Sequence, residues 1–308
     1  MLIYGVDHFT YQDVINIING KQKANLDKKS KTQIQNSYQN VQKIVKSDKT
    51  VYGINTGFGP LCDVKISEEE TAQLQENLII SHSVGVGKPI AKELSKIMMV
   101  CKIHALSKGF SGISLDVVER LMLMLEKDII PVVPEQGSVG ASGDLAPLSH
   151  LVLPLLGLGK VWEGENTVET AQVLEKHQLQ PLKLQAKEGL ALINGTQFIL
   201  AHAILGLDKF KYLLDLADVA AAFSIEAYQG SASPFKKELH EIRAYKGSQL
   251  VAKRMTKLLK NSENLEYHEN CGRVQDPYSM RCVPQVHGAS RNAYEHLKQM
   301  AETELNSV

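Results

Sequence analysis

The sequence predicts a mainly α-helical protein in which one long apolar segment belongs to a helical bundle. Apolar residues recur at spacings of three and four along most of the chain, as on the buried face of a helix. Strand-like alternation is confined to short segments, of which 51–54 and 160–162 are the best candidates. From Leu190 to Tyr228 the residues are mainly apolar or small and include no proline, which favours a long bundle helix.

Three further helices are expected before this segment. Their start signals are a capping-box spacing at 67–70, a proline suited to a first helical turn at Pro89, and an N-cap at Ser114. Each signal is followed by apolar side chains at helical spacing. The last segment, 285–305, also has a helical pattern and stops without a cap or breaker, so we expect the chain to be truncated there.

These elements suggest two regions. Residues 1–189 contain helices that are broken by Gly-rich loops, whereas residues 190–308 contain long helices. We therefore predict an N-terminal region 1–189 followed by the first part of a central helical bundle, 190–308.

The composition is that of a folded protein with a sizeable core. Of the 308 residues, 44% are hydrophobic and 22% charged, and 34 basic residues balance 34 acidic ones, which gives no electrostatic footprint for nucleic acid. No apolar run approaches the roughly 20 residues that span a bilayer, and the strongest candidate is 145–158. The N-terminus lacks a signal-peptide pattern, and four cysteines do not suggest a disulfide framework. We expect a cytoplasmic protein that binds neither nucleic acid nor membrane.

The segment 137–150, GSVGASGDLAPLSH, concentrates glycine and serine directly before an apolar run. A linker, a phosphate cradle, a nucleophile turn and a self-modifying backbone each use such small residues. The immediate apolar run disfavours a linker, and no lysine follows the glycines as in a phosphate loop. Around Ser142 the order Gly-Ala-Ser-Gly-Asp lacks the last glycine of a GxSxG elbow.

The remaining interpretation uses Ala141-Ser142-Gly143 as the reagent of a backbone cyclisation. The amide nitrogen of Gly143 can attack the carbonyl carbon of Ala141, and loss of water closes a five-membered ring. Loss of the Ser142 hydroxyl then leaves an exocyclic methylidene. Glycine leaves the path of attack open and tolerates the backbone strain. Taken alone the tripeptide is common, and a tight surface turn is the simpler interpretation.

Five motifs taken together resemble the aromatic amino acid ammonia-lyase and aminomutase family, whose prosthetic group is 4-methylidene-imidazole-5-one (MIO). In the family's order they are YGINTGFGPL at 52–61, SHSVGVG at 81–87, GSVGASGDLAPLSH at 137–150, EGLALINGTQ at 188–197 and QDPYSMRCVPQVHG at 275–288. The resemblance covers essentially the whole chain. It implies that MIO forms from Ala141-Ser142-Gly143 without an external cofactor. It also implies a mainly α, fumarase/aspartase-like fold in which the region that carries this loop precedes a central helical bundle.

Within the family, the pattern is most similar to the histidine-selective members. The resemblance therefore implies non-oxidative deamination of L-histidine to trans-urocanate and ammonia by a homotetramer. Tyrosine or phenylalanine deamination, an aminomutase reaction, or an inactive helical oligomer remain open alternatives. The family's chains run considerably beyond residue 308, so we expect that a C-terminal fragment is missing and that this segment alone is poorly active.

The resemblance also assigns roles around the electrophile. Tyr52 is a candidate base or proton relay, although a phenol with a pKa near 10 needs neighbouring donors or positive charge to act as a phenolate. Asn194 is a candidate for orienting or polarising the carbonyl of the electrophile, and Gln275 for a similar hydrogen bond. Without the resemblance, Asn194 is a capping or turn residue, since Asn-Gly is a frequent turn pair.

Three residues are candidates for contacting the substrate. Arginine pairs with a carboxylate through two hydrogen bonds, so Arg281 is predicted to bind the substrate carboxylate, with a structural ion pair as the alternative. Tyr278 is expected to position the electrophile or the reacting carbon, and either it or Tyr52 is the base. His82 is placed where a polar side chain can hydrogen-bond an imidazole, although a lone histidine is also common in cores.

One spacing competes with the lyase interpretation. His268, Cys271, Cys282 and His287 are spaced as in some zinc sites. However, Cys271 and Cys282 bracket the DPYSMR motif that the lyase interpretation already uses. We therefore predict no metal.

Overall fold

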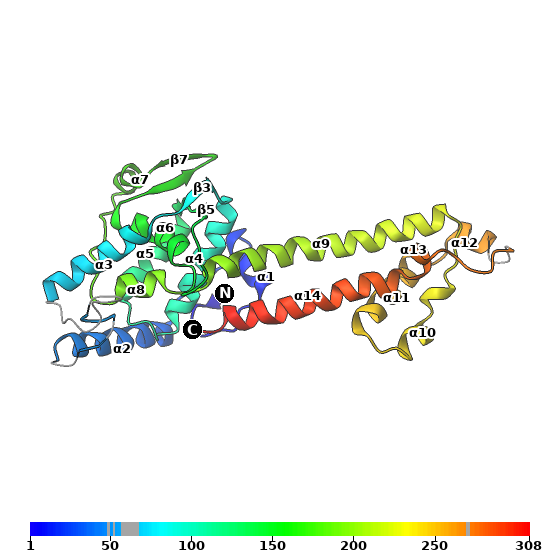
Figure 1. Cartoon of the computed structure of the whole chain (residues 1–308), viewed down its shortest axis with the longest axis horizontal. Coiled ribbons are helices and arrows are strands. Elements are labelled where there is room, and N and C mark those ends of the chain that lie inside the picture. The colour runs from blue at the N-terminus through cyan, green and yellow to red at the C-terminus, as the bar shows by residue number, and fades with distance from the viewer. Residues whose placement is uncertain (48–49, 52, 57–67, 269–271) are drawn as a thin grey trace. The chain divides into compact units, whose positions relative to one another are not determined.

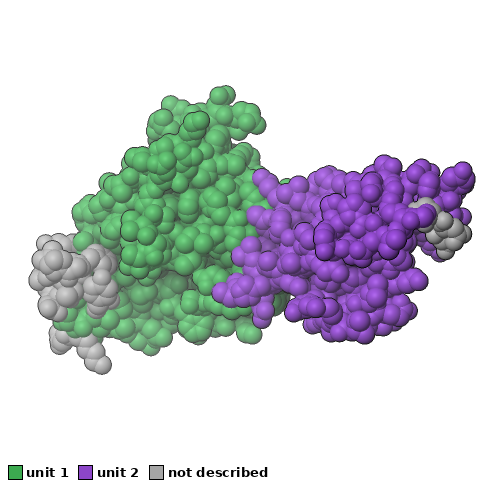
Figure 2. All heavy atoms as spheres, turned by 45° about the vertical axis from the view of Figure 1, so that its right-hand side comes forward, with its two compact units in different colours: residues 1–205, 301–308 green, residues 206–300 purple. Residues whose placement is uncertain are grey.

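The chain forms two units in a computed structural model that describes residues 1–47, 50–51, 53–56, 68–268 and 272–308. Unit 1 comprises residues 1–205 and 301–308, and unit 2 comprises residues 206–300, as Figure 2 shows in green and purple. The boundary falls inside helices α9 (Gln197–Ala227) and α14 (Val283–Leu305), so each unit contains part of both helices. The boundary that the sequence suggests near residue 190 stays a prediction.

The prediction of a mainly α fold is confirmed, since helices dominate both units and the strands are short (Figure 1). Besides its parts of α9 and α14, unit 1 contains helices α1 (Tyr11–Ile18), α2 (Lys28–Val45), α3 (Glu68–His82), α4 (Lys92–Ser107), α5 (Leu115–Glu126), α6 (Leu145–Val152), η2 (Leu153–Leu156), α7 (Thr170–Lys176) and α8 (Glu188–Ile193). Its strands are β1 (Leu2–Ile3), β2 (Ala24–Asn25), β3 (Val86–Pro89), β4 (Ile130–Pro131), β5 (Pro134–Gln136), β6 (Lys160–Glu163) and β7 (Asn166–Glu169).

These strands form three small sheets. β1 pairs with β2 in parallel, β3 pairs with β5 in antiparallel orientation, and β6 lies between β4 and β7 in an antiparallel sheet. Ile130 of β4 and Val161 of β6 are fully buried, so this sheet contributes to the core.

Helix α4 forms the centre of unit 1. Helices α1, α2, α5 and α6 and strand β4 all pack against it. Its side chains are therefore buried on every face, and the buried set includes Lys102 and His104. A helix that is apolar on all sides is stable only inside a core, and a charged residue in it must find a partner there.

The structure corrects some of the expected boundaries. Pro89 lies in strand β3, and the helix that follows it begins only at Lys92. The described residues of 51–54 form a turn rather than a strand, whereas 160–162 lie in β6 as predicted. The long apolar segment is two helices, because α8 ends at Ile193 and α9 begins at Gln197.

The same segment has the composition of a membrane-spanning helix. By length and composition alone, Glu188–Ala227 is long and apolar enough to cross a bilayer, with a mean hydropathy of 1.6 in its most apolar window. Half of that window is buried, and core helices of soluble proteins pass the same test. The sequence-based expectation had named 145–158, rather than this segment, as the strongest candidate run.

Unit 2 is built around its own small apolar core. Besides parts of α9 and α14 it contains η3 (Ser233–Phe235), α10 (Lys237–Glu241), α11 (Lys246–Leu258), α12 (Glu263–Tyr267) and α13 (Tyr278–Arg281). The core consists of Ala222, Ile225, Phe235, Val251, Met255, Leu259 and Val283. These residues come from α9, η3, α11 and α14, so burial of this cluster holds the helices of the unit together.

Candidate active site

Three backbone segments of unit 1, each at the end or the start of a helix, lie next to one another. Helices α3, α6 and α8 pack against each other in pairs. The segment 82–85 begins at the last residue of α3, the loop before α6 is 137–144, and the break between α8 and α9 is 194–196. Close contacts described below join the first segment to the second and the second to the third. The tripeptide 141–143, which is predicted to form the electrophile, therefore lies on a segment that the fold brings next to the segments of Asn194 and His82.

Asp144 fixes the end of the loop to the start of α9. Its carboxylate is fully buried, and Oδ2 accepts hydrogen bonds from the amides of Phe198 and Ile199 at 3.0 Å each. Oδ1 accepts a hydrogen bond from the Ser138 hydroxyl at 2.8 Å. The first amides of a helix have no partner within the helix and carry partial positive charge, so a carboxylate is stabilised there.

Gly143 lies so close to the break between α8 and α9 that no side chain fits. A Cβ atom on Gly143 would lie 2.3 Å from the Gly195 carbonyl oxygen, and its φ of +86° is also one that favours glycine. The same Gly195 carbonyl accepts a hydrogen bond from the Asp144 amide at 2.7 Å. Ala141 and Ser142 are exposed. The loop is therefore anchored at its Gly143-Asp144 end, and the two residues before it face outward.

The segment that carries His82 is anchored to the same loop region. The amide of Gly85 donates to Nε2 of His150 on α6 at 2.9 Å, and burial lowers the pKa of His150, which favours the neutral ring that can accept. A Cβ atom on Gly137 would lie 3.0 Å from Cα of Gly85. The backbone that follows His82 is thus in direct contact with the start of the loop.

The tautomer of His82 follows from its hydrogen bond within α3. Nδ1 lies 2.8 Å from the carbonyl oxygen of Leu78. Because a carbonyl only accepts, Nδ1 carries the proton and donates, and Nε2 of a neutral ring is left as an acceptor. His82 is half-buried.

Asn194 caps the C-terminal end of α8. Its carbonyl oxygen accepts a hydrogen bond from Nζ of Lys102 on α4 at 2.8 Å, and the residue itself is exposed. The backbone of Asn194 is therefore tied to the core.

The other predicted site residues belong to unit 2 or lie outside the described residues. Gln275 and Tyr278 are exposed, and Arg281 stacks on Tyr278 with its guanidinium carbon 4.2 Å from the ring centroid. Nε of Arg281 is buried without a hydrogen-bond partner, and no carboxylate among the described residues pairs with this guanidinium. Tyr52 lies outside the described residues.

Comparison with known proteins identifies the family. The family model described as "aromatic amino acid lyase" matches residues 9–308.

The chain belongs to the aromatic amino acid lyase family.

Similar curated proteins are histidine ammonia-lyases. That of Streptococcus sanguinis (strain SK36) is 43% identical over 302 residues, which is 98% of this chain and 59% of that protein. That of Myxococcus xanthus (strain DK1622) is 41% identical over the same shares. The chain thus spans less than two thirds of the length of these relatives.

Solved structures of the family have the same fold. The crystal structure of histidine ammonia-lyase from Trypanosoma cruzi matches with a TM-score of 0.88 and 37% identity, over 99% of this chain and 57% of that one. A tyrosine aminomutase from Streptomyces globisporus matches with a TM-score of 0.91 and 32% identity, over 99% of this chain and 61% of that one. The aromatic amino acid lyase family therefore includes both lyases and aminomutases that resemble this chain.

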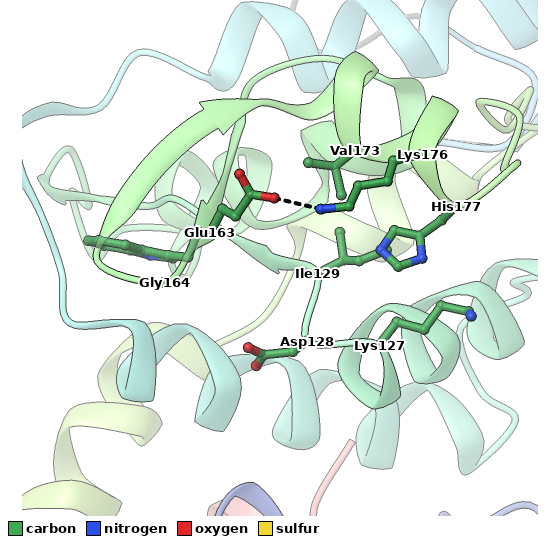
Figure 3. A pocket seen from close by; sticks show the side chains of 9 residues that line it. Lys127, Asp128, Ile129, Glu163, Gly164, Val173, Lys176 and His177 are labelled. Atoms are coloured by element: carbon green, nitrogen blue, oxygen red, sulfur yellow. Dashed lines mark hydrogen bonds and ion pairs between the residues drawn. The ribbon is translucent and has the colours of Figure 1, made fainter.

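A small surface pocket lies elsewhere in unit 1 of this aromatic amino acid lyase. It has a volume of about 190 Å³ and is lined by residues 127–129, by residues 162–164 at the end of β6, and by Val173, Lys176 and His177 in and directly after α7. Figure 3 shows most of these side chains. Glu163 and Lys176 form an ion pair across its rim. None of the residues predicted for the active site lines this pocket. Among the described residues there is also no group of three or more side chains arranged to hold a metal ion.

Three residues of the site escaped the sequence-based prediction. Asp144, Lys102 and His150 were not singled out, although each contacts the backbone of a predicted segment. Asp144 directly follows the tripeptide, and Lys102 is the single cation between Met98 and His104 in an apolar helix. Such an isolated charge in a buried helix is a signal that sequence analysis can use.

Proposed function

We propose that this protein is an MIO-dependent ammonia-lyase that converts L-histidine to trans-urocanate and ammonia without oxidation. The observation that supports this most directly is the close contact of Gly143 and Asp144, at the end of the Ala141-Ser142-Gly143 loop, with the backbone of Gly195. The identity to histidine ammonia-lyases supports the choice of histidine.

The residues of the loop fit the prosthetic group. Gly143 is the residue whose nitrogen must attack, and its place admits no side chain because a Cβ atom would collide with the Gly195 carbonyl oxygen. Ser142, which must lose its hydroxyl, is exposed. Asp144, the residue after Gly143, is tied to the start of α9 because its carboxylate accepts hydrogen bonds from the Phe198 and Ile199 amides. When formed, MIO supplies an electron-poor methylidene carbon, a function that no protein side chain provides.

Residues of the chain then bind and orient the substrate around this group. Asn194 is exposed at the end of α8, on a backbone that contacts the loop, and in our proposal its amide hydrogen-bonds the carbonyl of the electrophile. His82 retains a free Nε2 acceptor, which can receive an N–H of the substrate imidazole.

We propose Arg281 as the residue that binds the substrate carboxylate. Arg281 has a buried Nε without a partner, which supports binding of an external anion over a structural ion pair. The stacking of Arg281 on Tyr278 restricts its side chain, so less freedom is lost when a carboxylate binds. Gln275 is proposed to hydrogen-bond the electrophile. Either Tyr278 or Tyr52 removes the β-proton.

We also propose that the enzyme is a cytoplasmic homotetramer. In unit 2, helix α9 exposes large apolar side chains, which indicates a surface that another chain covers. These are Phe210, Tyr212, Leu213, Leu216 and Phe223. The unpaired thiols of Cys101 and Cys282 are consistent with a reducing compartment. The mass of the assembly in solution, measured by light scattering, tests the tetramer.

Intact-protein mass spectrometry of the 308-residue chain tests the electrophile. We expect a mass about 36 Da below that of the encoded sequence, because cyclisation removes two waters. The Ser142→Ala variant is the control, since it lacks the hydroxyl that must leave. A wild-type mass equal to the encoded mass, together with no product from any amino acid, would overturn the proposal.

Ultraviolet absorbance of the products tests the substrate. Even if turnover by the 308-residue chain is slow, L-histidine should give more urocanate than L-tyrosine or L-phenylalanine gives cinnamate-type product. Product from tyrosine with none from histidine would show that the assignment of His82 to imidazole recognition is wrong.

A further inference from the structure

The backbone at Asn194 and Gly195 is a break between two helices, and buried charged groups hold it on both sides. On the side of α9, the Asp144 carboxylate accepts hydrogen bonds from the first helical amides. On the side of α8, the Lys102 amino group donates to the Asn194 carbonyl oxygen. A cation is favourable at the C-terminal end of a helix and an anion at the N-terminal end.

Lys102 is an unusual residue for its position. It lies in the middle of α4, the helix that the rest of unit 1 surrounds, and only 2% of its surface is exposed. No carboxylate among the described residues pairs with its amino group, and the Asn194 carbonyl is its hydrogen-bond partner. Burial, together with the charge of Lys187, lowers the pKa of Lys102 to about 7. Both the ammonium and the neutral amine can donate, so the bond persists on either side of that pKa.

A buried amino group without a carboxylate is costly, whereas methionine fills a similar space at no such cost. Packing therefore does not explain why a lysine stands at position 102 of α4. The Lys102 amino group instead contacts the Asn194 carbonyl oxygen. The next carbonyl along the chain, that of Gly195, accepts a hydrogen bond from the Asp144 amide and lies against Gly143.

We propose that Lys102 is a positioning residue that fixes the 194–195 peptide and, through it, the electrophile loop. The amino group holds the Asn194 carbonyl toward the core. The next carbonyl, that of Gly195, is thereby kept where the Asp144 amide reaches it and where Gly143 packs. Lys102 itself touches neither the loop tripeptide nor the substrate in this scheme. The part of the inference that concerns cyclisation rests on the proposed function, whereas the part that concerns backbone position does not.

Lys187 provides a matched control in the same unit. Its amino group also donates to a backbone carbonyl, that of Ser111 at 2.5 Å, and burial lowers its pKa as well. The Ser111 carbonyl is not part of the break or of the loop. Substitution of Lys187 by methionine therefore removes the same kind of bond without releasing the 194–195 peptide.

Hydrogen–deuterium exchange of Lys102→Met, Lys102→Arg and Lys187→Met chains tests the proposal. In Lys102→Met we expect exchange about tenfold faster than wild type in peptides that cover 137–150 and 190–200. Lys102→Arg, which keeps a buried donor, should exchange like wild type there, and so should Lys187→Met. If Lys102→Met exchanges no faster than Lys187→Met in these two peptides, the proposal is wrong. If Lys102→Met does not fold, Lys102→Leu, which also lacks a donor, takes its place with the same expectation.

The rate of mass loss after synthesis gives the second readout. If wild type loses about 36 Da, Lys102→Met should lose it at least fivefold more slowly while Lys187→Met matches wild type. Equal rates in all three chains would overturn the role in cyclisation. If wild type keeps its encoded mass and forms no product from any amino acid, the proposed function fails, and the exchange comparison still decides whether Lys102 positions the backbone.

Discussion

Two buried carboxylates, one in each unit, have different kinds of partner that compensate their negative charge. Asp144 in unit 1 and Asp218 in unit 2 are both fully buried. Asp144 accepts from backbone amides at the start of α9 and from one hydroxyl. Asp218 instead pairs with the side chains of Arg254 at 2.6 Å and Arg291 at 2.5 Å. His287 adds a contact to Asp218 at 2.9 Å.

The difference indicates what each carboxylate stabilises. Side chains from α11 and α14 converge on Asp218 of α9, so this cluster ties three helices together and tolerates small shifts of backbone. The amides that bind Asp144 belong to the backbone itself, so this carboxylate fixes one loop relative to one helix end. We infer that the first arrangement supports packing and the second supports the geometry of a site.

The largest effect on stability is expected from Asp218→Ala. Removal of this carboxylate leaves two guanidinium groups without their buried counter-charge, and breaking such a pair typically costs about 3–5 kcal/mol. Urea unfolding should therefore show a loss of about 4 kcal/mol in the free energy of unfolding.

Asp215→Asn is the control for this change, because Asp215 joins the same arginines but is partly exposed. It should cost clearly less. If Asp218→Ala changes the exchange of peptide 137–150 as much as it lowers stability, the separation of packing from site geometry is wrong.

A smaller loss of stability with a larger effect on the site is expected from Asp144→Ala. Two amides of α9 and the Ser138 hydroxyl lose a charged acceptor, which should cost about 3 kcal/mol. In addition, the loop end is released, so we expect the chain to retain the encoded mass. Asp144→Asn keeps one acceptor oxygen and should cost about 1 kcal/mol. Normal mass loss by Asp144→Ala would contradict the view that this carboxylate sets the geometry of the loop.

The helices of both regions could be predicted from the sequence because their signals are local. Apolar spacing around α4 and α5, the N-cap at Ser114 and the helical pattern at 285–305 all correspond to observed helices. The break at 194–196 was indicated only as a possible Asn-Gly turn at Asn194. The apolar residues on both sides favoured one long helix, and the interruption depends on contacts with the loop.

The partners of the buried charges could not be predicted for the same reason. Lys102 and Asn194 are 92 residues apart, and Asp218 and Arg291 are 73 apart, so only the folded chain brings them together. The motifs at 81–87, 137–150 and 188–197 indicated which segments matter for a site. They did not indicate which core residues hold those segments.

Of the three buried groups, His104 is expected to have the smallest effect on the free energy of unfolding. It contrasts with the two carboxylates because it is buried as a neutral ring. His104 on α4 is fully buried, its Nδ1 accepts from the Gly5 amide at 3.3 Å, and its ring lies 4.1 Å from that of Phe9. Burial, with a smaller contribution from the charge of Lys108, lowers its pKa from 6.5 to about 4.

Since the unfolded chain binds this proton near pH 6.5 and the folded chain only near pH 4, stability should fall as the pH is lowered between these values. From pH 7 to pH 5 the loss that His104 contributes amounts to about 2 kcal/mol in the free energy of unfolding. A His104→Gln chain should lack this part of the pH dependence, as measured by urea unfolding at both pH values. An unchanged slope in that variant would mean that other groups carry the acid sensitivity. Because neither backbone amides nor arginines compensate a charge on His104, the protein can bury this ring only in its neutral form.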